Sequence, residues 1–240
     1  MASGAWPPVR PSLPPPVGLR PAFAWAGFSV IAEIKRASPS KGLIADHPVT
    51  AWAQGLERGG AAMLSVLTER TYFHGNLETL GEVAAAVKVP LLRKDFLLAP
   101  FELDEAVAFG ASAVLLIVAF AGAELPSLYR EARARGLSVL MEVHHERELD
   151  AAFRCSAFSD DATMLGVNQR DLESLAVDPR FAERLVPRLP RGCRFVVESG
   201  IAGPTDLAWA RSIGASGVLV GEALAKTADP GATLAGWLAA

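Results

Sequence analysis

Short apolar runs alternate with longer alanine-rich segments along most of this chain. Eight runs have the length and the leucine-rich or β-branched composition of buried strands, and they cover residues 28–34, 61–69, 89–96, 112–118, 137–143, 163–168, 194–199 and 217–223. The segments between them have the amphipathic pattern of helices, and they cover residues 50–58, 77–87, 100–109, 121–135, 145–153, 179–187 and 204–213. The chain is therefore predicted to repeat a strand–helix unit.

This alternation indicates parallel strands with helices packed outside them. Eight such units favour an α/β fold of the (βα)8 TIM barrel type over an open doubly wound sheet. An open sheet usually has a G-x-G-x-x-G turn after its first strand, and this chain has none there. The length of 240 residues agrees, because such barrels commonly fill about 200 to 250 residues. We expect a single barrel domain over residues 27–240.

The first 26 residues depart from the pattern. They contain seven of the seventeen prolines, and proline lacks the backbone N–H that a helix interior needs. We expect residues 1–26 to form a short proline-rich N-terminal lead, extended along the molecule as a tether or a partial cap.

Composition and charge exclude several classes of protein. A content of 51% hydrophobic and 20% charged residues is typical of a globular protein, and a net charge of −3 provides no general attraction to nucleic acid or to an anionic membrane. The longest apolar run, residues 111–121, is too short to cross a bilayer. The two cysteines form no C-x-x-C pair and no signal-like run opens the chain, which predicts a cytoplasmic protein. The four histidines lack metal-ligand spacing, so we expect no metal site; His144 and His145 are expected to begin a solvent-facing helix.

Ionisable residues end nearly every predicted strand. In barrels of this kind, functional groups lie at the carboxyl ends of the strands. One such residue is ordinary, because ion pairs at strand ends also occur in proteins without catalysis. Several converging on one mouth would suit acid/base chemistry on an anionic substrate, although an ion-pair plug is an alternative interpretation. The convergent set is Glu33, Lys35, Lys94, Glu142 and Glu198.

Glycines follow the last two predicted strands and are not explained by an ion-pair plug. Gly200 and Gly221 would let backbone N–H groups approach a ligand, in the region where such barrels usually bind phosphate. Ser38 and Ser40 could add hydroxyl donors or could cap their loop. Phe96 could stack on an aromatic ligand, although core packing is the favoured interpretation.

Several motifs in this order resemble the indole-3-glycerol phosphate synthase family, from about residue 28 to the C-terminus. They are IAEIKRASPSKG, SVLTERTYFHG, PLLRKDF, MEVH, GVNQRDL, VVESGI and VGEAL. The resemblance implies a (βα)8 barrel enzyme of tryptophan biosynthesis. Its reaction would close 1-(2-carboxyphenylamino)-1-deoxyribulose 5-phosphate to indole-3-glycerol phosphate with release of CO2 and water. It implies a small-molecule phosphosugar substrate and no cofactor.

The resemblance also implies roles for individual residues. Lys94 would be the general acid that protonates the ribulose carbonyl, and Lys35 would hold the substrate carboxylate. Glu142 would act in later proton removal and dehydration, while Glu33 and Asn168 would orient the reacting hydroxyls. The remaining predicted site residues would support this network or surround the substrate and its phosphate, and they are Glu198, Ser38, Phe96, Arg170, Ser199, Gly200, Gly221 and Glu222.

The acid role of Lys94 carries an electrostatic expectation. A free lysine has a pKa of about 10.4 and is a poor acid at neutral pH. We expect burial and the charge of Lys35 to lower the pKa of Lys94, with the nearby glutamates limiting that shift.

The chain departs from the family pattern at three places. Members usually carry a longer helical segment before the first strand, where this chain has its proline-rich lead, so we expect altered capping of the mouth and altered substrate affinity. Gln169 stands where asparagine is usual and Ala99 where aspartate is usual, and neither belongs to the acid/base set.

Two other functions remain open from the residues alone. Another phosphosugar barrel isomerase or epimerase would share the glycine-rich loops but would not need both Lys35 and Lys94. A non-catalytic barrel that binds a phosphorylated metabolite or a partner enzyme would not need an intact set of both lysines with Glu142 and Asn168. The polar helix faces predict a monomer.

Overall fold

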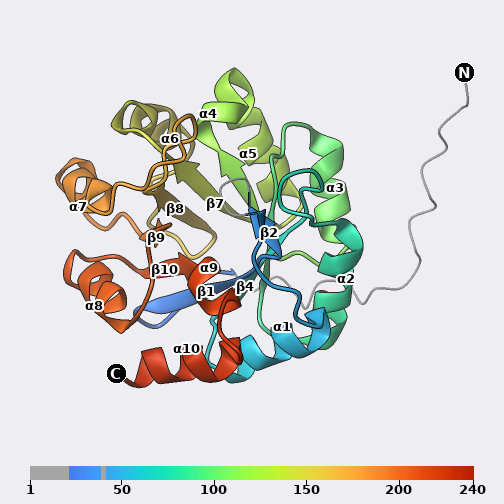
Figure 1. Cartoon of the computed structure of the whole chain (residues 1–240). Coiled ribbons are helices and arrows are strands. Elements are labelled where there is room, and N and C mark those ends of the chain that lie inside the picture. The colour runs from blue at the N-terminus through green and yellow to red at the C-terminus, as the bar shows by residue number, and fades with distance from the viewer. Residues whose placement is uncertain (1–21, 39–41) are drawn as a thin grey trace, which may run out of the picture.

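Eight parallel strands close into a barrel, which confirms the predicted fold class (Figure 1). The computed structural model describes residues 22–38 and 42–240. Around the barrel the hydrogen-bonded order is β1-β10-β9-β8-β7-β6-β5-β4 and back to β1. The strands are β1 (Ser29–Ile34), β4 (Met63–Leu67), β5 (Leu91–Lys94), β6 (Ala113–Ile117), β7 (Ser138–Val143), β8 (Thr163–Asn168), β9 (Phe195–Glu198) and β10 (Gly217–Val220).

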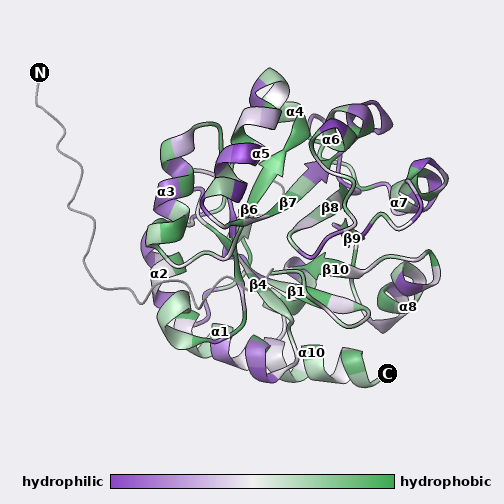
Figure 2. Cartoon of the chain, turned by 180° about the vertical axis from the view of Figure 1, so that it is seen from behind, coloured by the Kyte–Doolittle hydropathy of each residue, from purple (hydrophilic) through white to green (hydrophobic). Residues whose placement is uncertain are grey.

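Helices surround the strands and turn their apolar faces inward (Figure 2). They are α1 (Val49–Arg58), α2 (Leu77–Ala86), α3 (Pro100–Ala108), α4 (Val118–Ala121), α5 (Leu125–Ala134), α6 (Leu149–Cys155), α7 (Phe181–Leu185), α8 (Pro204–Ser212), α9 (Glu222–Ala225) and α10 (Pro230–Ala239). The helix predicted over 121–135 is interrupted, because Gly122 has a left-handed φ of 52° and a 3-10 turn precedes α5. The last two helices were not predicted.

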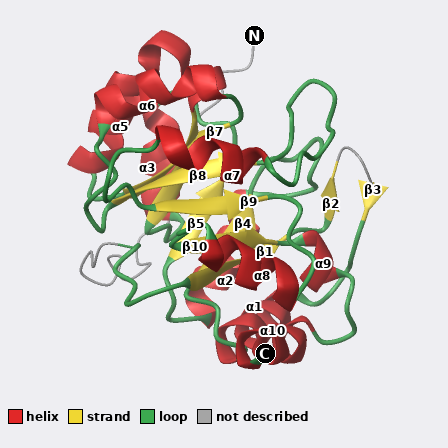
Figure 3. Cartoon of the chain, turned by 90° about the vertical axis from the view of Figure 1, so that its left-hand side faces the viewer, coloured by secondary structure: helices red, strands yellow, loops and turns green. Residues whose placement is uncertain are grey.

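A short hairpin also departs from the prediction. After β1, strand β2 (Ala37–Ser38) pairs antiparallel with β3 (Gly42–Leu43). The hairpin stands on the same side of the barrel as α9 (Figure 3). This side carries the carboxyl ends of the barrel strands, because α9 follows β10 directly. The hairpin therefore belongs to the rim of the mouth.

The amino-terminal end of the barrel is closed by residues from the predicted lead. Phe23 is fully buried against the inner side chains of the barrel. Its N–H donates to the carbonyl of Asp161 at 3.2 Å, and its own carbonyl accepts from Arg194 at 2.7 Å. The N–H of Ala22 donates to the hydroxyl of Ser138, the first residue of β7, at 3.0 Å. Residues 1–21 lie outside the described residues, and the boundary at residue 26 stays a prediction.

Candidate active site

One large cavity opens at the carboxyl ends of the strands, with a volume of about 710 Å³. Every predicted site residue lines it, which shows that these groups are brought together by the barrel. They are Glu33, Lys35, Ser38, Lys94, Phe96, Glu142, Asn168, Arg170, Glu198, Ser199, Gly200, Gly221 and Glu222. Ser40, the other serine of the predicted turn, lies outside the described residues.

Lys94 lies at the floor of this cavity between two carboxylates. Its Nζ is 3.0 Å from Glu142 Oε2 and 3.4 Å from Glu198 Oε2. Burial alone would lower the pKa of Lys94, but the charges of Glu142, Glu198 and Glu33 outweigh it, and the pKa is raised. The expected lowering was wrong, because Lys35 pairs instead with Glu33 at 2.9 Å. Lys94 is therefore a firmly charged ammonium.

The second lysine and its partner occupy a separate part of the mouth. Glu33 is buried on β1, and its Oε2 also accepts from the hydroxyl of Ser65 at 3.4 Å. The side chain of Lys35 retains 21% exposure. Gly221 at the end of β10 leaves the space that Glu33 needs, since a Cβ there would lie 2.6 Å from Glu33 Oε1. Lys35 is thus held near the opening, where a substrate anion can reach it.

The two carboxylates beside Lys94 differ in their ionisation. Burial opposes the charge of Glu142, yet Lys94 and His144 hold the pKa of its carboxyl well below the usual value. Burial and the charge of Glu142 raise the pKa of Glu198 well above it. Neither oxygen of Glu198 has a hydrogen bond of good geometry within the described part of the chain. The lack of a side chain at Gly166 gives Glu198 its place, because a Cβ there would lie 2.3 Å from Oε1.

We expect Glu198→Gln to make folding stability less dependent on pH. A raised folded pKa means that protonated Glu198 stabilises the fold fully below its unfolded value of 4.5 and loses that contribution as pH rises through the folded pKa. Glutamine does not titrate. As pH rises above 4.5, the free energy of unfolding of the variant should therefore increase relative to that of the wild type, by at most about 1.4 kcal/mol per pH unit.

Urea unfolding from pH 4.5 to 8 measures this difference. Glu82→Gln, at an exposed position of α2, is the matched control. A constant gap between Glu198→Gln and the wild type at all pH values would show that Glu198 is ionised in the fold.

His144 belongs to the site, and the expectation of a solvent-facing helix start was wrong. Its ring is fully buried. Nε2 lies 2.7 Å from Glu142 Oε1, and Nδ1 lies 2.7 Å from the carbonyl of Arg170. The helix begins later, with a 3-10 turn at Glu146 and α6 at Leu149. The neighbouring His145 does lie at the surface, with its side chain 36% exposed.

Backbone groups after β8 and β9 form one side of the cavity. Asn168 Oδ1 accepts from the Ser199 hydroxyl at 2.8 Å and from the Arg170 N–H at 3.0 Å. Ser199 and Gly200 have left-handed φ values of 64° and 77°, a conformation that is costly for a serine. Gln169, the departure from the family pattern, donates its side-chain N–H to the Ser199 carbonyl at 3.0 Å. This residue therefore supports the loop.

Aromatic side chains form the opposite wall. The Phe96 ring contacts Phe120 edge-on, with centroids 5.2 Å apart, and lies 6.5 Å from Phe73. All three line the cavity, and Phe96 also packs against the inner core. Phe96 therefore lies at the border between core and cavity, where it packs against the core. A role in stacking on a ligand stays a prediction.

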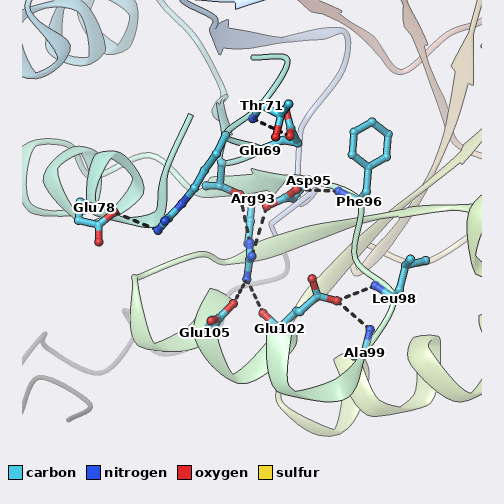
Figure 4. A network of polar contacts seen from close by, with 12 residues as sticks. Glu69, Thr71, Glu78, Arg93, Asp95, Phe96, Leu98, Ala99, Glu102 and Glu105 are labelled. Carbon is cyan, nitrogen blue, oxygen red and sulfur yellow. Dashed lines mark hydrogen bonds and ion pairs between the residues drawn. The ribbon is translucent and has the colours of Figure 1, made fainter. Parts of the chain in front are cut away.

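Arg93 holds the loop after β5, and the sequence reasoning missed it. The guanidinium is 4% exposed. It donates to the Glu102 carbonyl at 2.6 Å, to Glu105 at 3.2 Å, to Asp95 at 3.3 Å and to the Thr68 hydroxyl at 3.2 Å (Figure 4). A charged residue inside a leucine-rich strand was the available signal. The network ties the loop that follows Lys94 to α3.

Two negative findings apply to the described residues. They contain no group of three or more histidines, cysteines or acidic residues that could hold a metal ion. Within the same ranges, no helix has the length and the apolar character needed to cross a membrane.

Comparison with known proteins decides the family. A family model described as indole-3-glycerol phosphate synthase matches residues 22–235. The indole-3-glycerol phosphate synthase of Mycolicibacterium smegmatis is 43% identical over 224 residues, covering 92% of this chain and 80% of the relative. The indole-3-glycerol phosphate synthase of Mycobacterium avium is 44% identical over 224 residues, and the match again covers 92% of this chain and 80% of the relative. The chain belongs to the indole-3-glycerol phosphate synthase family.

Membership in this family establishes the activity that the sequence predicted. The indole-3-glycerol phosphate synthases are decarboxylating carbon–carbon lyases of tryptophan biosynthesis, which act on a small phosphosugar substrate, and this is the function of the chain. A solved thiamine phosphate pyrophosphorylase from Pyrococcus furiosus superposes with a TM-score of 0.64 at 15% identity, covering 88% of this chain and 94% of that one. At that identity, the likeness shows only the shared barrel fold.

Proposed function

We propose that Lys94, held between Glu142 and Glu198, is the general acid of the ring closure. The ring carbon attacks the ribulose carbonyl, and negative charge develops on that oxygen. A charged ammonium stabilises this charge in a pocket of low dielectric. Its raised pKa does not prevent transfer, because the carbonyl oxygen becomes an alkoxide in this step, and an alkoxide is a strong enough base to take a proton from an ammonium group. Loss of CO2 then restores the aromatic ring, and Glu142 accepts a proton in the dehydration that follows.

The substrate would lie across the cavity with its anionic groups at opposite ends. Lys35 has its Nζ 5.9 Å from the Phe73 ring centroid, beside the aromatic wall. It would hold the substrate carboxylate while Phe96 contacts the anthranilate ring. Glu33 and Asn168 would orient the hydroxyls of the sugar chain, and Arg170 and Glu198 would complete the polar lining. This placement brings the attacking carbon and the carbonyl together.

The phosphate would lie against the loops after β9 and β10. Ser199, Gly200, Gly221 and Glu222 line this end of the cavity, and their backbone N–H groups would donate to the phosphate oxygens. The hydroxyl of Ser38 is buried and has no hydrogen bond to another described residue. It is therefore an available donor for a phosphate oxygen.

The proposed reaction is tested by incubating the purified chain with the carboxyphenylamino-deoxyribulose phosphate and following the fluorescence of the indole product. We expect steady formation of indole-3-glycerol phosphate without added metal or cofactor. Absence of product from a folded chain would contradict the proposal.

Ala202→Asp tests the phosphate end separately. Ala202 is exposed, lines the cavity and follows Gly200 by two residues, so a new carboxylate there would repel the phosphate. We expect KM to rise about tenfold or more, with kcat nearly unchanged and a smaller effect at high salt.

Ala202→Asn is the matched control, since it has nearly the same shape without the charge. Equal KM values for the aspartate and asparagine variants would place the phosphate elsewhere in the cavity.

We further propose that the chain acts as a monomer in the cytoplasm. Most large exposed apolar side chains of the described residues lie on segments that follow barrel strands: Leu43 on β3, Tyr72 and Leu98 on loops, and Phe120 on α4. Cys155 and Cys193 are free thiols, which is usual in a reducing compartment. Sedimentation of the purified chain tests the oligomeric state.

A further inference from the structure

The ring of His144 lies between a backbone carbonyl oxygen and a carboxylate oxygen. Nδ1 faces the backbone carbonyl of Arg170 at 2.7 Å, and Nε2 faces Glu142 Oε1 at 2.7 Å. A carbonyl oxygen can only accept, so Nδ1 carries a proton and donates it. If the ring were neutral, the lone pair of Nε2 would face the carboxylate oxygen. This short contact therefore requires a second proton between Nε2 and Oε1.

We propose that His144 is a positioning residue of the synthase reaction, which holds this proton against Glu142 Oε1 as an imidazolium, keeps the carboxylate ionised and directs its other oxygen to Lys94. The proposal rests on the acid/base role proposed above for Glu142. The two oxygens of this carboxylate are then occupied in different ways. Oε1 is fixed by the imidazolium, and Oε2, 3.0 Å from the Lys94 ammonium, faces the cavity.

Contacts on both sides of the ring support this arrangement. The backbone N–H of His144 donates to Glu148 Oε2 at 2.7 Å, which places a second carboxylate near the imidazolium. The guanidinium of Arg170 donates to the Leu175 carbonyl at 2.7 Å, so it is turned to its own loop. The Nδ1 hydrogen bond also joins Glu142 to the loop after β8, where Asn168 ends the strand.

The charged groups around the pair set its response to pH. Lys94 faces Glu142 from β5, and Glu198 from β9 lies close to both of them. Glu33 from β1 also acts on Lys94 through its charge. Burial alone would lower the pKa of His144, but the charge and hydrogen bond of Glu142 raise it above its ordinary 6.5. The ring therefore keeps its second proton to a higher pH than a free imidazole does, and loses it as pH rises through the raised value. Above that pH, the Nε2 lone pair would repel Glu142.

Two substitutions of His144 test the Nδ1 and Nε2 donors one at a time. In His144→Gln, the amide N–H can occupy the position of Nε2 and donate to Glu142 without a charge. In His144→Asn, the shorter side chain can reach only the Arg170 side. We expect His144→Asn to lower kcat about 10- to 100-fold with little change in KM, because Glu142 loses its fixed orientation. We expect His144→Gln to recover part of kcat and to lose the decline in activity on the alkaline side.

His145→Asn is the matched control, because its exposed ring lies 3.6 Å from Asp171 and outside the cavity lining. It should retain the wild-type kcat and pH profile. Nitrogen NMR of the wild-type chain measures the ring directly. If its signals are assigned through the bonds that join each ring to its own backbone, the result does not depend on how the variants fold. We expect both nitrogens of His144 to be protonated at pH 7.5.

A neutral ring in either tautomer at this pH would overturn the proposal. A wild-type kcat and pH profile in His144→Asn would also overturn it. Glu142→Gln distinguishes the role of His144 from that of Glu142. If Glu142→Gln is inactive while His144→Asn behaves as wild type, only the role of His144 fails. If Glu142→Gln is fully active, the proposed role of Glu142 fails as well.

Discussion

Lys94→Ala is expected to lower kcat/KM by about 10³- to 10⁴-fold. A positioned general acid contributes about 10²- to 10⁴-fold, and Lys94 would also provide the positive charge that stabilises the developing alkoxide. The substitution leaves Glu142 and Glu198 buried without their shared cation. Breaking such a buried pair costs about 3–5 kcal/mol, unless the carboxylates take up protons. The loss should therefore appear in both rate and stability.

Product fluorescence measures the rate, and thermal unfolding at pH 5 and pH 8 measures the stability. Lys88→Ala, at an exposed position before β5, is the matched control and should behave as wild type. Because Glu142 and Glu198 can be protonated at low pH, the stability loss in Lys94→Ala should be smaller at pH 5 than at pH 8. Turnover near the wild-type level in a folded Lys94→Ala would refute the proposed role of this lysine.

Phe23→Ala is expected to lower the free energy of unfolding by about 3–5 kcal/mol. The side chain is fully buried among the inner residues of the barrel, and its ring also contacts Trp25 edge-on at 5.7 Å. Removing the ring leaves a cavity at the amino-terminal end of the barrel that the closed sheet cannot collapse to fill. For a chain of this size, the melting temperature should fall by roughly 2–4 °C per kcal/mol.

Chemical and thermal unfolding check this value. Leu238→Ala on α10 is the control, since its side chain is 39% exposed and its loss should cost within about 0.5 kcal/mol. Equal effects of the two substitutions would mean that residue 23 does not contribute to the barrel core. kcat should change less than stability in Phe23→Ala, because the cavity that binds substrate opens at the other end.

The hydrophobic pattern was sufficient to predict the strands of the barrel. The run predicted over 112–118 contains β6 at Ala113–Ile117, and the run over 163–168 is β8 itself. A fully buried parallel strand is continuously apolar, so its sequence differs from the amphipathic helices on either side. Short helical pieces are harder to predict. α9 has only four residues, too few to show a helical period.

The residues that line the cavity were also predictable from position along the chain. Glu33, Lys94, Glu142 and Glu198 each lie at or near the end of a strand, and parallel strands in a closed barrel bring their carboxyl ends to one rim. His144 was missed because a histidine just after a strand and before acidic residues looks like a helix start. Its hydrogen-bond partner, the Arg170 carbonyl, belongs to another loop, which local sequence does not reveal.

The sequence by itself determined the barrel strands and most of the helices between them, which chemistry gathers at the strand ends and which family the motifs resemble, because these follow from local periodicity and residue type. Only the tertiary structure decided the pairing of the charges. Lys94 faces Glu142 and Glu198 while Lys35 faces Glu33, so the pKa of Lys94 is raised and not lowered. Distance and burial set the strength of each electrostatic interaction, and residues distant in the chain acquire both only when the barrel closes.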